Sequence, residues 1–211
     1  MKSINCNYIE IVKTKLKKFR KFNALNQLDK KMLNYINFSD GFYIECGAND
    51  GVNQSNTWYL EKYLNWKGIL IEPLREKFKE LKKNRSNKNF FYNVALSSPN
   101  NKKVFIENNG LMSKVINKID KRTKLTETKC KTLTAILDQA FAPNLIDFFS
   151  LDVEGHEDKV IEGINFKKYN FKFFLVETKK KNVTQFLKEN NYKLIKKMSY
   201  HDYLFKYKNS I

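Results

Sequence analysis

The sequence contains few cysteines and histidines and no long apolar run, and each shortage disfavours a class of protein. The three cysteines, Cys6, Cys46 and Cys130, are odd in number and far apart, so they offer neither a CxxC pair nor a disulfide framework. With only His156 and His201 beside them, a zinc site of the usual Cys/His kind is disfavoured. No run of about 18 apolar residues exists, and the first residues lack the apolar core of a secretory signal. We therefore expect a cytoplasmic protein without a transmembrane segment.

The length and composition predict one globular domain. A chain of 211 residues can bury a sizeable core, and a hydrophobic content of 42% argues against disorder. No internal repeat or low-complexity linker divides the chain. Apolar residues recur at helical spacing from Tyr8 to Phe19, with lysines around them. We expect residues 1–38 to be a helical lead-in packed on the body, and 39–211 to be the main domain. A basic helix lying on an anionic membrane surface is the alternative.

The net charge of +18 suggests a polyanionic partner, but a simpler explanation exists. Only four of the 40 basic residues are arginines: Arg20, Arg75, Arg85 and Arg122. Lysine and asparagine are the residues that AT-rich codons supply, so genome composition accounts for the charge. Nucleic-acid recognition depends on arginine and on stacked aromatic side chains, and the sequence has no arginine cluster.

Strand-like and helix-like stretches alternate from Gly41 onward. Apolar runs of strand length occur at 42–46, 68–72, 89–96, 103–106, 125–131, 146–153 and 171–177. Helical spacing of apolar residues occurs at 74–81, 133–140 and 183–187. Two final strands, at 192–198 and 202–207, are close enough to form a hairpin. This order predicts an α/β fold with a mostly parallel sheet, covered on both faces and ending in an antiparallel hairpin.

Two polar strand ends predict a nucleoside-binding site. Gly47 and Gly51 follow the first strand, where glycine lets the backbone turn sharply and approach a ligand. Their GxxxG spacing is not GxGxxG, and no Walker lysine follows, so a pyrophosphate cradle is disfavoured. Glu72 closes the next strand, where an acid can accept both hydrogen bonds of a ribose diol. S-adenosylmethionine is the common cofactor of that shape. The alternative is a tight turn next to a surface acid.

Two further strand ends carry a cluster of ionisable groups. Asp152, Glu154, His156 and Glu157 lie within six residues, and Glu177 ends the neighbouring strand. If the strand continues, Asp152 and Glu154 point the same way. The acids Asp152, Glu154 and Glu177 are candidate oxygen ligands for a divalent cation such as Mg²⁺, or acceptors of a substrate proton. His156 is a candidate general base because its reference pKa is near neutral. The alternative is a solvated turn at a helix N-terminus.

With these motifs placed, the chain resembles the FkbM-type family of S-adenosylmethionine-dependent methyltransferases. The resemblance extends from Gln27 to Tyr207 and is strongest in the stretch GFYIECGANDG at 41–51. It continues through SNT at 55–57, WKGILIEP at 66–73, NVALS at 93–97 and LDVEGHE at 151–157. Several motifs in the right order make the resemblance specific.

The resemblance implies a class I methyltransferase fold, a Rossmann-like sheet of seven strands whose last strand is antiparallel. It also implies cofactor roles, with Glu72 at the ribose, Asn93 and Val94 beside the adenine, and Asp152 beside the sulfonium and the incoming hydroxyl. The methionine end would be held by Glu45, Gly47, Ala48, Asn49 and Gly51. Cys46 is expected only to pack, because its side chain alternates away from that of Glu45.

Characterised relatives methylate hydroxyl oxygens on sugars or polyketide-type products, so the resemblance implies O-methylation, with a sugar or glycan as the first-choice acceptor. Methyl transfer needs in-line alignment, and Asp152, His156 or a cation-bound hydroxyl would act as the base. Residues 98–130 and the N-terminal helix are the expected substrate lid. Two other functions stay open. One is a methyltransferase acting on RNA or another polyanion, and the other is a non-catalytic protein of this fold that works by protein contact.

Overall fold

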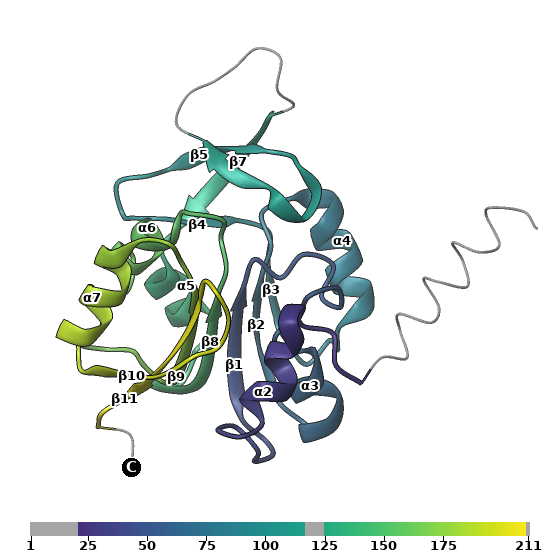
Figure 1. The fold of residues 1–211 in the computed structure, drawn as a ribbon. Helices are drawn as coiled ribbons and strands as arrows, with labels where there is room; N and C mark the ends of the chain where they lie inside the picture. Colours follow the sequence, from purple (N-terminus) through teal and green to yellow (C-terminus); the bar gives the residue numbers. More distant parts are fainter. Residues whose placement is uncertain (1–20, 117–124, 210–211) are drawn as a thin grey trace, which may run out of the picture.

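The computed structural model describes residues 21–116 and 125–209, which form two sheets (Figure 1). The larger sheet has 7 strands in the order β10-β11-β9-β8-β1-β2-β3. They are β1 (Phe42–Cys46), β2 (Lys67–Ile71), β3 (Phe90–Tyr92), β8 (Leu145–Leu151), β9 (Asn170–Glu177), β10 (Tyr192–Lys197) and β11 (Asp202–Tyr207). Neighbouring strands are parallel, except that β11 runs antiparallel to β9 and β10. The predicted α/β fold with an antiparallel C-terminal hairpin is confirmed.

Helices cover both faces of the larger sheet (Figure 1). On one face lie α2 (Leu28–Met32), α3 (Trp58–Leu64) and α4 (Arg75–Asn84), and on the other lie α5 (Leu133–Gln139), α6 (Glu157–Glu162) and α7 (Lys181–Glu189). Successive strand residues belong to different cores, because side chains alternate across a strand. Tyr43 and Phe148 pack under the first set of helices, and Ile44 and Phe149 pack under the second. This double burial explains the continuous apolar runs in the sequence.

The smaller sheet lies across the top of the larger one in Figure 1. Its strands are β4 (Ala95–Leu96), β5 (Lys103–Glu107), β6 (Lys114–Ile116) and β7 (Leu125–Lys131), in the order β4-β7-β5-β6. The short helix η2 (Gly110–Met112) connects β5 to β6. The single strand predicted at 89–96 is therefore wrong, because the chain passes from one sheet to the other at Asn93. The Asn93 side chain donates to the carbonyl oxygens of Glu72 (2.8 Å) and Pro73 (3.0 Å), which fixes this crossing point.

The described part of the N-terminal segment packs on the body. After η1 (Leu25–Gln27), the buried side chains of Leu28, Met32 and Ile36 join the core under α3 and α4. The amphipathic helix expected from Tyr8 to Phe19 lies outside the described residues. Within 21–116 and 125–209, the helices are too short and too polar to cross a membrane.

Candidate functional site

A cavity lies where β1, β2 and β8 end, next to the smaller sheet. Its walls contain many of the residues predicted from the sequence: Gly47, Ala48, Asn49, Glu72, Val94, Asp152, Glu154 and His156. The smaller sheet and η2 add a wall that the sequence predicted only as a lid region, formed by Ile106, Gly110, Leu111, Ser113 and Val115. Among the described residues, the predicted Glu45, Gly51, Asn93 and Glu177 do not line this cavity.

The turn after β1 depends on the glycine at position 47. Gly47 has a φ of +82°, and a Cβ built there would lie 2.0 Å from the carbonyl oxygen of Asp152. A side chain would therefore push the end of β1 away from the end of β8. The amide of Asp152 donates to the carbonyl oxygen of Cys46 at 3.2 Å, which holds the two strand ends together. The sequence predicted that Gly47 would let the backbone approach a ligand. In the structure, it lets the end of β1 approach the backbone of Asp152.

Glu72 connects the turns that follow β1 and β2. It is 5% exposed. One carboxylate oxygen accepts the amide of Asn49 at 2.8 Å, and the other accepts the amide of Leu74 at 2.9 Å. Burial raises the pKa of Glu72 to about 7, against the effect of these two hydrogen bonds. Each carboxylate oxygen keeps acceptor capacity for a further donor, so the group can still receive a diol.

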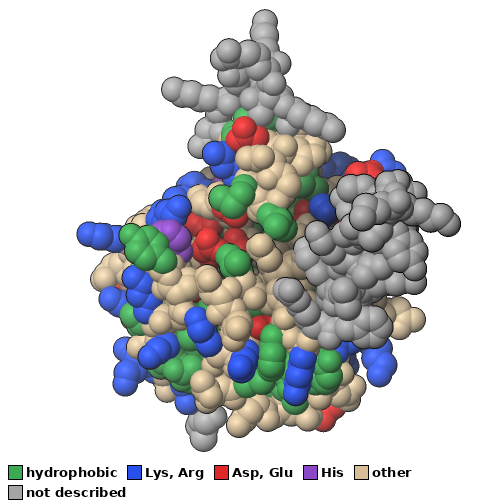
Figure 2. Space-filling view, turned by 45° about the vertical axis from the view of Figure 1, so that its right-hand side comes forward, with side chains coloured by type: hydrophobic (Ala, Val, Ile, Leu, Met, Phe, Trp, Pro, Cys, Tyr) green, Lys and Arg blue, Asp and Glu red, His purple; other side chains and the backbone are tan. Residues whose placement is uncertain are grey.

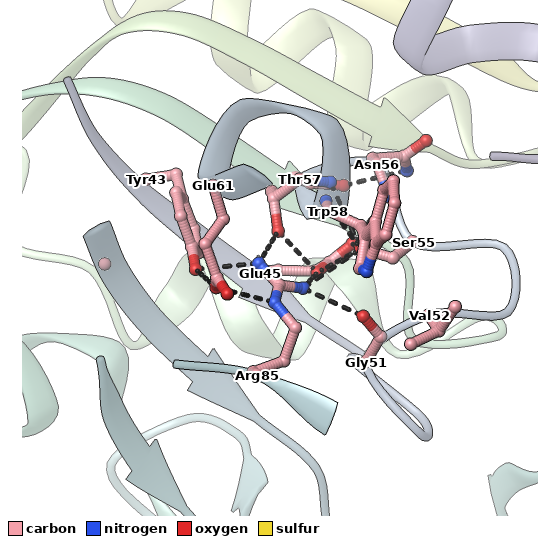
Figure 3. Close-up of polar contacts among 12 residues, drawn as sticks. Tyr43, Glu45, Gly51, Val52, Ser55, Asn56, Thr57, Trp58, Glu61 and Arg85 are labelled. Carbon is pink, nitrogen blue, oxygen red and sulfur yellow. Dashed lines mark hydrogen bonds and ion pairs between the residues drawn. The ribbon is translucent and has the colours of Figure 1, made fainter. Parts of the chain in front are cut away.

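Glu45 lies behind the turn after β1, in a buried network shown in Figure 3. Its carboxylate accepts hydrogen bonds from the hydroxyls of Ser55 (2.9 Å) and Thr57 (2.7 Å) and from the amide of Asn56 (2.7 Å). The alternation predicted between Glu45 and Cys46 exists, but it is Cys46 that lines the cavity. Glu45 was expected to contact a ligand, but its carboxylate binds the loop 55–57 instead.

Arg85 is the cation of this network, and its side chain is fully buried. It lies 2.7 Å from Glu61 and 3.3 Å from Glu45, and it also donates to the Tyr43 hydroxyl at 2.7 Å and to the carbonyl oxygen of Gly51 at 3.1 Å. Burial alone would raise the pKa of Glu61, but the charge and hydrogen bond of Arg85 hold that pKa below its usual value. Sequence reasoning missed Arg85, although its position at the end of an amphipathic helix was a signal of burial.

Acidic side chains gather beside a histidine on the face seen in Figure 2. Burial raises the pKa of Asp152 well above its usual value, and the nearby Glu177 and Glu154 raise it further. Burial also raises the pKa of Glu177, with Asp202 adding to the effect, although a hydrogen bond with Asp152 opposes it. Asp152 and Glu177 therefore lie within hydrogen-bond reach of each other, and of the two Asp152 lines the cavity.

The turn after β8 differs from the continued strand that the sequence suggested. The strand ends at Leu151, and Glu154 (φ 51°) and Gly155 (φ 96°) have left-handed backbones. Asp152 and Glu154 therefore do not follow the alternation of a strand. Across the described part of the chain, no three Asp, Glu, His or Cys side chains are arranged to hold a metal ion. The cation site expected at Asp152, Glu154 and Glu177 is not formed.

His156 lies at the start of α6 and lines the cavity. Its Nε2 is 3.0 Å from the hydroxyl oxygen of Ser97. Burial lowers the pKa of His156, so the imidazole is neutral near pH 7. The same turn is held by Lys180, whose ammonium donates to the carbonyl oxygen of Gly155 (2.6 Å) and to Asp158 (2.7 Å). Sequence reasoning missed both Ser97 and Lys180, because they contact the turn only through the fold.

Comparisons with known proteins agree with this geometry. A family model described as the methyltransferase FkbM domain matches residues 45–205. The solved methyltransferase FkbM from Methylobacillus flagellatus KT is similar at a TM-score of 0.53 and 14% identity, over 82% of this chain and 45% of that chain. A methyltransferase from Geobacter sulfurreducens is similar at a TM-score of 0.50 and 9% identity, over 100% of this chain and 91% of that one.

These likenesses are to the fold, which is that of class I methyltransferases. This chain spans less than half the length of the Methylobacillus protein. Among curated proteins, none has a sequence similar enough to match.

Proposed function

Because the chain belongs to the FkbM methyltransferase family, we propose that it transfers a methyl group from S-adenosylmethionine to a hydroxyl oxygen of a sugar or glycan. One observation carries the proposal: the Gly47 turn and the buried Glu72 carboxylate meet at one wall of a cavity. That pairing places a glycine turn where an amino-acid tail would lie and a diol acceptor where a ribose would lie, with no phosphate cradle. The hydroxyl acceptor is supported by the family resemblance.

The cavity has the chemistry that this cofactor requires. Backbone groups of Gly47, Ala48 and Asn49 would hold the methionine end, and Glu72 would accept the ribose hydroxyls. Apolar side chains line the cavity further along, at Ile71, Leu74, Val94, Ala95 and Leu96, where an adenine would pack. Bound S-adenosylmethionine supplies an activated methyl group on a positively charged sulfur.

Three of the predicted cofactor residues would act indirectly. Asn93 uses its side chain to hold the carbonyl oxygens after β2, and Glu45 uses its carboxylate to hold the loop after β1. Both residues therefore shape the walls of the cavity without lining them. Gly51 acts in the same way, because its carbonyl oxygen accepts from Arg85.

The acids at the end of β8 and β9 supply the base that the reaction needs. As the hydroxyl oxygen forms its bond to the methyl carbon and the carbon–sulfur bond breaks, the hydroxyl proton must leave. Asp152 lines the cavity, and in its ionised form its carboxylate is a stronger base than an exposed one, because burial and Glu177 raise its pKa. Alignment of the reacting atoms would supply most of the remaining rate enhancement.

Calorimetric titration with S-adenosylhomocysteine tests the cofactor site. We expect micromolar binding by the native protein, lost in the variant Glu72→Ala. A matched control is Glu76→Ala, which removes a carboxylate that is 78% exposed on α4 and should leave the affinity unchanged. If the folded native protein does not bind, or if both variants bind equally well, the proposed site is wrong.

The acceptor is tested separately by transfer of a labelled methyl group to a panel of sugars, glycans and RNA. We expect an alkali-stable methyl ether on a sugar hydroxyl. Label in RNA would replace the acceptor part of the proposal and leave the cofactor part intact.

A further inference from the structure

Three polar side chains form a hydrogen-bonded chain between the smaller sheet and the turn after β8. Ser97, which follows β4, is 0% exposed. Its hydroxyl oxygen lies 3.0 Å from Nε2 of His156 and 2.7 Å from the side-chain nitrogen of Asn101. The backbone fixes both ends of this chain, because the amide of Ser97 donates to Lys131 (3.0 Å) and the amide of Asn101 donates to Ser98 (3.1 Å).

The number of available protons determines which group donates and which accepts in each of these two hydrogen bonds. The side-chain nitrogen of Asn101 can only donate, so the Ser97 oxygen accepts that hydrogen bond. The hydroxyl has one proton of its own, and within the described residues its remaining partner is Nε2 of His156. If Nε2 also donated, the buried hydroxyl proton would have no acceptor, which is costly. Nε2 therefore accepts, and the proton of the neutral imidazole lies on Nδ1.

We infer that Ser97 and Asn101 hold His156 in the tautomer protonated at Nδ1, so that His156 is a hydrogen-bond donor in the cavity and not the general base. Within residues 21–116 and 125–209 the hydrogen bond of this ring is the one between Nε2 and Ser97, which leaves Nδ1 without a partner there, and His156 lines the cavity. A nitrogen that carries its own proton cannot take another from an acceptor hydroxyl. That proton must pass to a carboxylate of the turn after β8 that lines the same cavity, which is Asp152 or Glu154. Ser97 and Asn101 are thus positioning residues, and this catalytic meaning rests on the proposed function.

The surroundings of His156 favour the neutral ring that the inference requires. Burial lowers its pKa most, Lys180 and Lys159 lower it further, and the carboxylates of Asp158 and Glu162 oppose them. Because the ring is neutral near pH 7, a single tautomer can be assigned to it there.

Nitrogen-15 NMR of the histidine side chains tests the tautomer without any acceptor or cofactor. The chain has two histidines, so the variant His201→Gln leaves the signals of His156 alone. At a pH above the pKa of His156, we expect Nε2 to resonate as the unprotonated nitrogen and Nδ1 as the protonated one. The opposite pattern, or an even mixture of the two, would overturn the inference.

A matched pair of substitutions tests the role of the hydrogen bonds that join Asn101, Ser97 and His156. In Asn101→Asp the new carboxylate can only accept, so Ser97 should donate to it and Nε2 should become the protonated nitrogen. The control Asn100→Asp makes the same charge change at an exposed neighbour and should leave the tautomer as it is. Equal spectra for both variants would show that Asn101 does not orient Ser97.

The titration with S-adenosylhomocysteine separates the two proposals. A protein that fails to bind it but shows the Nδ1-protonated ring would refute the proposed function and keep the hydrogen-bond assignment. A protein that binds it but shows Nε2 protonated would do the reverse.

Discussion

The affinity for S-adenosylhomocysteine should fall as the pH is lowered from 8 to 6. Glu72 is buried and has a pKa of about 7, and both of its oxygens already accept backbone amides. A ribose diol adds donors, which favour the ionised carboxylate over the protonated one. Ligand binding therefore lowers the pKa of Glu72, and at pH 7 or below it must release a proton.

The size of the effect follows from the pKa. With a value of about 7 in the free protein, the ionised fraction of Glu72 falls from about nine-tenths at pH 8 to about one-tenth at pH 6. The dissociation constant should therefore rise about tenfold over this interval, which corresponds to about 1.4 kcal/mol. At pH 7 binding should release about half a proton.

Calorimetry in two buffers with different ionisation enthalpies measures both quantities. The number of protons released is the slope of the binding enthalpy against the ionisation enthalpy of the buffer. The variant Glu72→Gln is neutral at every pH, so it should bind more weakly and lose this proton release. Any pH dependence that it keeps belongs to other groups, such as His156 or Asp152. Tight binding that varies less than about twofold between pH 6 and 8, or the same proton release in Glu72→Gln, would refute the role of Glu72.

Three further predictions concern stability and cofactor binding. Arg85→Leu leaves the buried Glu45 without its cation and Glu61 with only Lys62, at 3.4 Å, and should lower the free energy of unfolding by about 3–5 kcal/mol in urea denaturation, whereas Lys82→Ala on the exposed side of α4 should change it by less than about 0.5 kcal/mol. Gly47→Ala should abolish cofactor binding because its Cβ meets backbone, and it should cost more unfolding free energy than Gly110→Ala, which at φ +59° with open space around it should cost only about 1–2 kcal/mol. Glu72 has a pKa raised from 4.5 to about 7, so its stabilising contribution is complete below pH 4.5 and is lost as the pH rises through about 7. The unfolding free energy of the native protein should thus fall by up to about 3 kcal/mol from pH 4.5 to 8, and Glu72→Gln should lack this part of the fall.

Periodicity predicted the larger sheet because its strands are buried on both faces. The runs that became β1, β2, β8 and β9 are mostly apolar, and such runs stand out in a sequence. The helices α4, α5 and α7 were predicted for a similar reason, since their apolar residues recur on one side. Periodicity did not predict α3, whose aromatic residues are mixed with charged ones, or α6, which is only 6 residues long.

Spacing along the chain could not predict which strand residues reach the cavity. Gly47 and Glu72 follow from their places at strand ends, and the structure brings them to one cavity wall. Glu45 faces away from that wall because Arg85, distant in sequence, offers it a buried cation. The partnership of Ser97 with His156 was equally hidden, because it joins two sheets across 59 residues of sequence. Contacts of this kind depend on tertiary packing, which local pattern does not contain.

The parallel pairing of β4 with β7 has a consequence for how this protein can diversify. Ala95 pairs with Cys130, and Leu96 pairs with Lys131, so the segment between β4 and β7 begins and ends at one place in the smaller sheet. The intervening segment is therefore a cassette with adjacent ends. Lengthening such a segment costs little free energy once its ends are held together, and the floor of the cavity, built from β1, β2 and β8, stays untouched. A new acceptor could be accommodated by exchanging the part of the cassette from Lys103 to Lys129, which leaves Ser97 and Asn101 in place, while the turns after β1 and β2 are inherited unchanged.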